Sequence, residues 1–205
     1  MSIKILPVDS TFPMERMIEF CRKADDDQMP AAENMSVEDW EIKTNTLLYL
    51  IYKEKRFEQE KKARYKVIEV DGEIIAGGGY YPLSGDPNIC LLSTRTYTIP
   101  TARQRMWHAE FLLPQNLEEI KTLNYKVGLF VFNEYNLWLR KFIQRIDEGL
   151  GAVFGYEHAS IYKGWESLKH PITIQNTKQW GLYRILDPGY RDQFLKVMAD
   201  LAYSE

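Results

Sequence analysis

The sequence predicts an α/β or α+β fold built on a mixed sheet. Two observations lead to this class. Segments in which apolar residues recur every second position are interspersed with segments in which they recur at helical spacing. Three strand-like segments also follow one another in the middle of the chain, which excludes a regular β-α-β series. A dinucleotide-binding fold is disfavoured, because no G-x-G-x-x-G joins a first strand to a first helix.

The first part of the chain predicts one strand and two helices. A short strand is expected over 2–8, and apolar residues at helical spacing predict a helix over 12–24. A longer helix is expected over 37–62. Ser36 precedes it, two acidic residues lie in its first turn, and Lys and Arg residues gather toward its end, as the helix dipole favours.

The rest of the chain begins with a hairpin. Two β-rich segments, 63–70 and 73–83, are joined by Asp71-Gly72, a typical two-residue hairpin turn. The later segments are expected to form, in order, a strand, a helix, a buried strand, a helix, two strand regions and a terminal amphipathic helix. They cover residues 88–99, 112–123, 126–132, 134–146, 152–165, 179–186 and 187–202.

The run Gly77-Gly78-Gly79 lies within the predicted strand over 73–83. Without the Lys-Ser/Thr of a nucleotide-binding P-loop, it indicates a bulge or a close crossing by another backbone more than a phosphate site.

Composition excludes several classes of protein. The chain has 205 residues and a formal net charge of −3, so attraction to nucleic acid is not expected. Cys21 and Cys90 stand in unrelated segments and predict reduced, buried thiols in a cytoplasmic protein rather than a zinc site. The three histidines show no metal-binding spacing. No apolar run approaches the ~20 residues of a membrane span, and no signal peptide is expected.

Three segments carry a resemblance to a known family. They are VIEVDGEIIAGGGYYP, RTYTIPTARQRMWHAEFLLP and VGLFVFNEYNLWLRKF, and with the order of elements they resemble the GNAT superfamily of N-acetyltransferases. The likeness covers most of 2–186. It implies a central, mostly antiparallel twisted sheet flanked by helices, and acetyl-CoA as cofactor. The division expected from it is a GNAT-like domain over 1–186, with an amphipathic helix over 187–205 packed on the same domain.

The resemblance also implies which residues hold acetyl-CoA. In the family, one strand splays from its neighbour, and its backbone binds the pantetheine arm. The turn after that strand offers backbone N–H groups to the pyrophosphate. The residues at these positions, together with one at the end of the fifth strand, are Tyr97, Thr98, Ile99, Arg103, Gln104, Arg105, Met106, Trp107, His108, Ala109 and Asn133.

The turn departs from the family pattern Q/R-x-x-G-x-G/A. With Gln104 in the first position, Ala109 keeps the final small residue, but Trp107 replaces the glycine. With Arg103 in the first position instead, Met106 and His108 replace both small residues. Arg103, Arg105 and His108 are expected to compensate through charge-assisted contacts.

The catalytic and acceptor-binding residues are less defined. The family often has a tyrosine as general acid seven residues after the asparagine, where this chain has Arg140. Tyr135 and His158 are the candidates for acid–base roles. The residues expected to contact the acceptor are Tyr80, Tyr81 and Arg95. No metal is expected.

Two functions therefore remain open. The first is an acetyl-CoA-dependent N-acetyltransferase acting on an amine of a small molecule or protein, with a homodimer as a further expectation and no membrane partner. The second is a catalytically degenerate GNAT-fold binding or structural module, favoured by the tryptophan in the glycine position.

Overall fold

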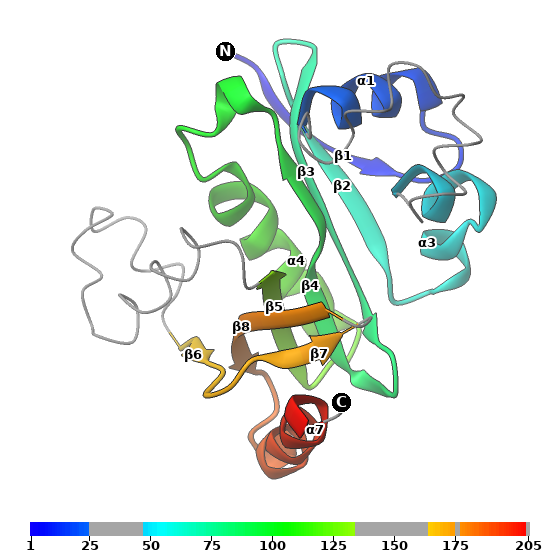
Figure 1. The fold of residues 1–205 in the computed structure, drawn as a ribbon. Coiled ribbons are helices and arrows are strands. Elements are labelled where there is room, and N and C mark those ends of the chain that lie inside the picture. Colours follow the sequence, from blue (N-terminus) through cyan, green and yellow to red (C-terminus); the bar gives the residue numbers. More distant parts are fainter. Residues whose placement is uncertain (25–46, 134–163, 175–176, 204–205) are drawn as a thin grey trace. The chain divides into compact units, whose positions relative to one another are not determined.

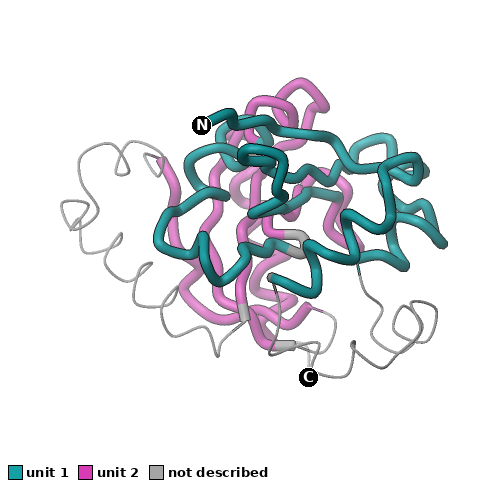
Figure 2. Tube along the Cα trace, turned by 90° about the horizontal axis from the view of Figure 1, so that it is seen from above, with its two compact units in different colours: residues 1–81, 94–116 teal, residues 82–93, 117–205 magenta. Residues whose placement is uncertain are grey.

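A computed structural model describes residues 1–24, 47–133, 164–174 and 177–203 (Figure 1). They form two compact units, coloured separately in Figure 2. Unit 1 comprises 1–81 and 94–116, and unit 2 comprises 82–93 and 117–205.

Unit 1 contains an antiparallel meander. β1 pairs with β2, β2 pairs with β3, and β4 follows β3 in the strand order. These strands are β1 (Ile3–Val8), β2 (Arg64–Val70), β3 (Glu73–Leu83) and β4 (Asp86–Thr98), of which the last two continue into unit 2. Asp71 and Gly72 join β2 to β3 with φ values of 49° and 94°. A two-residue hairpin turn of type I′ requires positive φ values at both central residues. The predicted hairpin is therefore confirmed.

Helix α1 (Met14–Ala24) supplies much of the apolar core of unit 1. Met17, Phe20 and Cys21 are each at most 1% exposed, and they belong to one cluster with residues of β2 and β3. The opposite face of α1 is charged, as its amphipathic spacing predicted.

The expected helix over 37–62 is wrong at its carboxyl end. Its first part, 37–46, lies outside the described residues. The described remainder contains a π-helical turn, η1 (Tyr49–Lys53), and a separate short helix, α3 (Arg56–Gln59). Lys55 between them has φ 51°, which breaks the helix. α3 then buries Phe57 against Tyr65, with ring centroids 5.8 Å apart, a tertiary contact that periodicity alone does not specify.

The three consecutive glycines lie in the interior of β3, as the strand interpretation predicted. A Cβ on Gly79 would lie 2.6 Å from the carbonyl oxygen of Arg64, and one on Gly77 would lie 2.9 Å from the Tyr65 hydroxyl. Glycine is therefore needed for the close approach of β2, not for a phosphate loop.

Unit 2 mixes parallel and antiparallel pairing. β4 pairs in parallel with β5 (Val127–Asn133), and β5 pairs antiparallel with β8 (Thr177–Ile185). Two short strands also pair antiparallel with β8, namely β6 (Glu166–Ser167) and β7 (Ile172–Ile174). The sequence did not predict β6 and β7, because two or three residues are too few to show a period.

The C-terminal helix α7 (Arg191–Tyr203) packs within unit 2 after a 3₁₀ turn, η5 (Pro188–Tyr190). Phe194 is fully buried, with its ring centroid 4.7 Å from that of Tyr183. At the start of α7, Arg191 donates two hydrogen bonds of 2.6 Å to Glu166. An aromatic contact and a bidentate ion pair thus help to hold the helix in unit 2.

The mixed α/β class with mostly antiparallel pairing is confirmed by these strands and helices. No helix in the described ranges combines the length and the apolar composition needed to cross a membrane.

Candidate functional site

In unit 2, β4 and β5 pair over only three residues each. The parallel register runs from Ile89–Val127 to Leu91–Leu129 and then stops, although both strands continue. Beyond that point, the N–H of Val131 donates to the side-chain hydroxyl of Ser93, at 2.9 Å, instead of to a strand carbonyl. A side chain therefore takes the place of main-chain pairing where the two strands cease to form a ladder.

In unit 1, the end of β4 has one edge engaged. The N–H of Ile99 donates to the carbonyl of Ile75 on β3, at 2.9 Å, so it is not available to a ligand. Successive N–H groups of a strand point to opposite edges, which directs the N–H of Thr98 to the edge of β4 away from β3. Of the predicted backbone donors at 97–99, Thr98 is thus the one whose N–H is directed away from β3.

The turn after β4 leaves several backbone donors unused. It opens with a 3₁₀ turn, η2 (Pro100–Ala102), and the N–H groups of Arg103 and Arg105 donate within the turn. The helical segment η3 (His108–Leu112) begins soon after. Within the described part of the chain, no group accepts a hydrogen bond from the backbone N–H of Met106, Trp107 or Ala109. Unsatisfied N–H groups at the start of a helix are suited to an anion.

Trp107, the residue in the glycine position, directs its indole into the protein. The side chain is 8% exposed and belongs to the apolar core cluster of unit 1. Its Nε1 donates to the carbonyl of Ala102 at 3.0 Å, and its ring stacks on Phe111 with centroids 5.4 Å apart. The indole therefore packs in the core beneath the turn and stabilises it through the hydrogen bond to Ala102.

The two arginines of the turn have different partners. Arg103 donates from Nε to the carbonyl of Thr98, at 3.2 Å. Arg105 donates from Nε to Glu110, at 2.6 Å, and its guanidinium lies over Trp107 and Phe111. Both side chains are exposed, so both remain accessible to an anion.

His108 is buried and packs on β3. Burial lowers the pKa of His108 to about 4, so the imidazole is neutral at pH 7 and adds no charge to the turn. A Cβ on Gly78 would lie 2.8 Å from its Cδ2 and 3.2 Å from Oγ1 of Thr96. The expected charge-assisted contact from His108 is therefore replaced by a packing role.

Pro114 does not end the helix that follows the turn. α4 (Leu113–Thr122) continues directly from η3. In the π turn, the N–H of Leu113 donates five residues back, to the carbonyl of His108. This wider turn adds a residue where the proline ring would otherwise meet the carbonyl of the preceding turn.

The other predicted site residues are distributed unevenly. Tyr97 is half-buried against Phe20, with centroids 6.5 Å apart. Tyr80 is 0% exposed, so it lines no open groove, whereas Tyr81 is half-buried beneath the guanidinium of Arg56.

The side chains of four predicted site residues are not among those that the structure describes. Arg95 lies on β4 and Asn133 ends β5, where it pairs with Gln179, but only their backbones are described. Tyr135 and His158, the predicted catalytic residues, lie outside the described residues.

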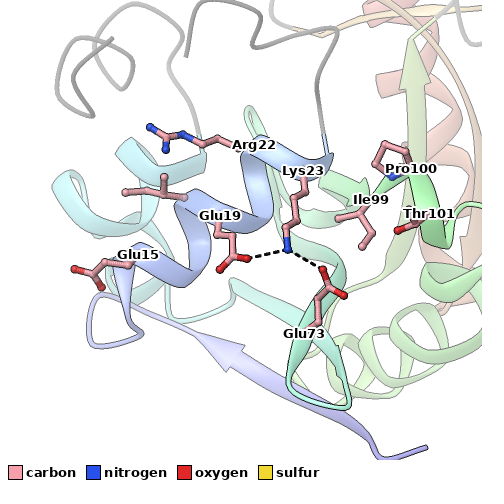
Figure 3. A pocket seen from close by; sticks show the side chains of 9 residues that line it. Glu15, Glu19, Arg22, Lys23, Glu73, Ile99, Pro100 and Thr101 are labelled. Atoms are coloured by element: carbon pink, nitrogen blue, oxygen red, sulfur yellow. Dashed lines mark hydrogen bonds and ion pairs between the residues drawn. The ribbon is translucent and has the colours of Figure 1, made fainter. Parts of the chain in front are cut away.

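A cavity of about 890 Å³ lies in unit 1 between α1 and the segment that opens the turn (Figure 3). Its lining residues are Glu15, Ile18, Glu19, Arg22, Lys23, Glu73, Ile99, Pro100 and Thr101. Lys23 lies 2.8 Å from carboxylate oxygens of both Glu19 and Glu73, and hydrogen bonds to these two carboxylates raise the pKa of Lys23. Ile99 alone of this lining was among the predicted cofactor residues.

No group of three or more His, Cys, Asp or Glu side chains suited to a metal occurs among the residues with described positions.

Sequence reasoning missed Ser93 in unit 2 and both Glu110 and Phe111 in unit 1. Ser93 lies in a strand where nothing marks a hydroxyl that replaces ladder pairing. Phe111 follows Trp107 by four residues, and this helical spacing is a signal that could have identified it. Glu110 lies five residues after Arg105, a spacing that predicts no contact on a helix.

Solved structures resemble this one over most of its length. An acetyltransferase of the GNAT family from Staphylococcus aureus Mu50 has 14% identity and a TM-score of 0.57, over 91% of this chain and 100% of its own. The PaiA N-acetyltransferase of Thermoplasma acidophilum, in complex with coenzyme A, has 16% identity and a TM-score of 0.54, over 90% and 99%. A ribosomal-protein-alanine N-acetyltransferase from Brucella melitensis has 16% identity and a TM-score of 0.52, over 91% and 100%.

No protein-family model matches the chain, and no curated protein sequence matches it. The likeness is therefore one of structure. With its antiparallel meander, the short β4–β5 ladder and the turn before η3, the chain has the GNAT N-acetyltransferase fold.

Proposed function

We propose that this protein is an acetyl-CoA-dependent N-acetyltransferase that acts on an amine of a small molecule or protein. The observation that carries the proposal is the turn between β4 and η3. On a GNAT fold, it presents the N–H groups of Met106, Trp107 and Ala109 without an acceptor in the described chain.

The turn fits a diphosphate despite its missing glycine. Glycine is favoured in such turns because backbone and phosphate must approach closely. Here the indole of Trp107 is buried in the core, which removes it as an obstacle to that approach. Arg103 and Arg105 add positive charge, and the helical segment 108–122 begins at the turn with the positive end of its dipole.

Groups of this chain would bind the cofactor and move the proton of the acceptor amine. Thr98, with its N–H at the open edge of β4, is the donor available to a pantetheine arm or to a carbonyl that gains negative charge. When bound, acetyl-CoA supplies an activated acyl thioester. Tyr135 and His158 remain the candidates from the sequence for moving the proton of the acceptor amine.

The test is calorimetric titration of the purified protein with acetyl-CoA, with desulfo-CoA as a probe of pyrophosphate recognition alone. We expect a micromolar dissociation constant, about −8 kcal/mol, for acetyl-CoA. Acetyl transfer to an amine panel would then be followed by thiol release. Absence of heat, together with an unchanged melting temperature at millimolar ligand, would reject the proposal and favour the binding-module alternative.

A further inference from the structure

We propose that Glu110, Trp107 and Phe111 act as positioning residues that hold Arg105 as a fixed ligand for a phosphate group. The inference rests on the proposed function and deepens it. It assigns the phosphate contact to one arginine and explains how the turn binds a diphosphate without the family's glycine.

Arg105 is held on two sides. Its guanidinium carbon lies 4.6 Å from the ring centroid of Trp107 and 5.0 Å from that of Phe111, and the two rings stack on each other. Its Nε donates to Oε2 of Glu110 at 2.6 Å. A stacked and hydrogen-bonded guanidinium loses less conformational entropy on binding a ligand than a mobile arginine does.

The terminal nitrogens of Arg105 are the part left for a ligand. Glu110 engages Nε, and no group in the described ranges accepts a hydrogen bond from Nη1 or Nη2. These nitrogens carry four of the five guanidinium N–H donors. Two parallel N–H groups match two oxygens of a phosphate, which a lysine ammonium does not.

The exposed fractions of the two side chains indicate whether Glu110 positions Arg105 or competes with a phosphate for it. If Glu110 competed with a phosphate, its carboxylate would have to be open to solvent beside the arginine. The Glu110 side chain is instead 15% exposed, whereas that of Arg105 is 43% exposed. An incoming anion therefore meets the guanidinium, and the carboxylate lies behind it.

Arg103 and Arg105 differ in the contacts that hold their side chains. The Nε of Arg103 donates to a main-chain carbonyl, that of Thr98. The Nε of Arg105 donates instead to a carboxylate, and its guanidinium lies over two aromatic rings. The geometry therefore assigns the oriented phosphate contact to Arg105.

The experiment is calorimetric titration of the full chain with coenzyme A, using Arg105→Ala, Glu110→Ala, Glu110→Gln and the double variant Arg105→Ala/Glu110→Ala. We expect Arg105→Ala to weaken binding about 10- to 100-fold, the range of a charge-assisted hydrogen bond. Glu110→Ala should weaken it several-fold. Glu110→Gln should stay within about twofold, because its amide oxygen still accepts from Nε.

The double variant distinguishes an effect of Glu110 through Arg105 from a general loss of structure. If Glu110 acts through Arg105, then Glu110→Ala adds no further loss when Arg105 is already alanine. Arg105→Ala should also reduce the salt dependence of binding, since one charge contact to phosphate is gone. Glu118→Ala, which breaks an exposed ion pair with Lys121 on α4, is the matched control and should bind like the unaltered protein.

Other outcomes would overturn the inference. Tighter binding by Glu110→Ala would show competition, and an equal loss in both backgrounds would show a structural effect. Unchanged binding by Arg105→Ala would remove Arg105 from the site while the proposed function stands. No binding by the unaltered protein would reject both the function and the inference.

Discussion

At the scale of single residues, the contact between Gly78 and His108 joins β3 to the turn. The imidazole lies 2.8 Å from the position that a Cβ on residue 78 would take, and burial lowers its pKa to about 4. Any side chain at 78 must therefore displace His108, the residue next to Trp107. A small residue on a core strand thus influences the geometry of a turn some thirty positions later.

We expect Gly78→Ala to destabilise the protein by about 1–3 kcal/mol, because the added methyl group would lie 2.8 Å from the imidazole. Urea denaturation measures the loss. His108→Ala should relieve the clash, so Gly78→Ala should cost clearly less in that background. Gly189→Ala is the control: its nearest neighbour is a side-chain oxygen of Asp187 at 3.3 Å, and a small effect is expected. Equal losses in both backgrounds would contradict the assignment of the clash to His108.

At the scale of elements, η3 and α4 show how a helix accommodates a proline within it. The π turn ends at Leu112, two residues before Pro114, and the helix continues to Thr122. α7 illustrates ordinary amphipathic packing: Phe194 and Met198 are buried, whereas Leu195 is 42% exposed.

Adjacent residues of α7 allow a matched comparison. Phe194→Ala should cost about 3–5 kcal/mol, because it removes a fully buried ring in contact with Tyr183. Leu195→Ala, one position later on the exposed side, should change stability by less than about 0.5 kcal/mol. The urea midpoints of the two variants test this directly. Similar losses of stability would show that α7 does not bury Phe194 against Tyr183 as described.

At the scale of the whole molecule, the titrating groups favour neutral pH. The pKa of His108 is lowered from 6.5 to about 4, so between these values the unfolded chain binds a proton that the folded chain does not. Hydrogen bonds from Arg16 and from Arg191 lower the pKa values of Glu69 and Glu166 below 4.5. Their stabilising contribution is present above that pH and is lost as the pH falls through their folded-state pKa values.

We therefore expect the free energy of unfolding to fall as the pH falls from 6.5 to 4, by on the order of 3 kcal/mol from His108. A further decline should follow below 4.5. His108→Asn should abolish the first decline and keep the second, as measured by urea denaturation across pH. NMR titration of the imidazole in the unaltered protein provides an independent readout. An apparent pKa near 6.5 for His108 would contradict the burial argument.

The sequence by itself determined the order of most elements, the Asp71-Gly72 hairpin and the GNAT-like turn after β4. These features follow from local chemistry, namely apolar period, turn propensity and the residues of a short motif. They are readable without the fold, because each depends on neighbours within a few positions.

Tertiary structure alone decided what the large residues of the turn do. The sequence shows a tryptophan and a histidine where small or charged groups were expected, but not that the core of unit 1 takes up the indole or that Gly78 admits the imidazole. It also does not show that Arg105 donates a hydrogen bond to Glu110, or that a positive φ at Lys55 separates η1 from α3. Each of these depends on contacts between a residue and elements distant from it or on the path of the surrounding backbone, which a linear pattern does not encode.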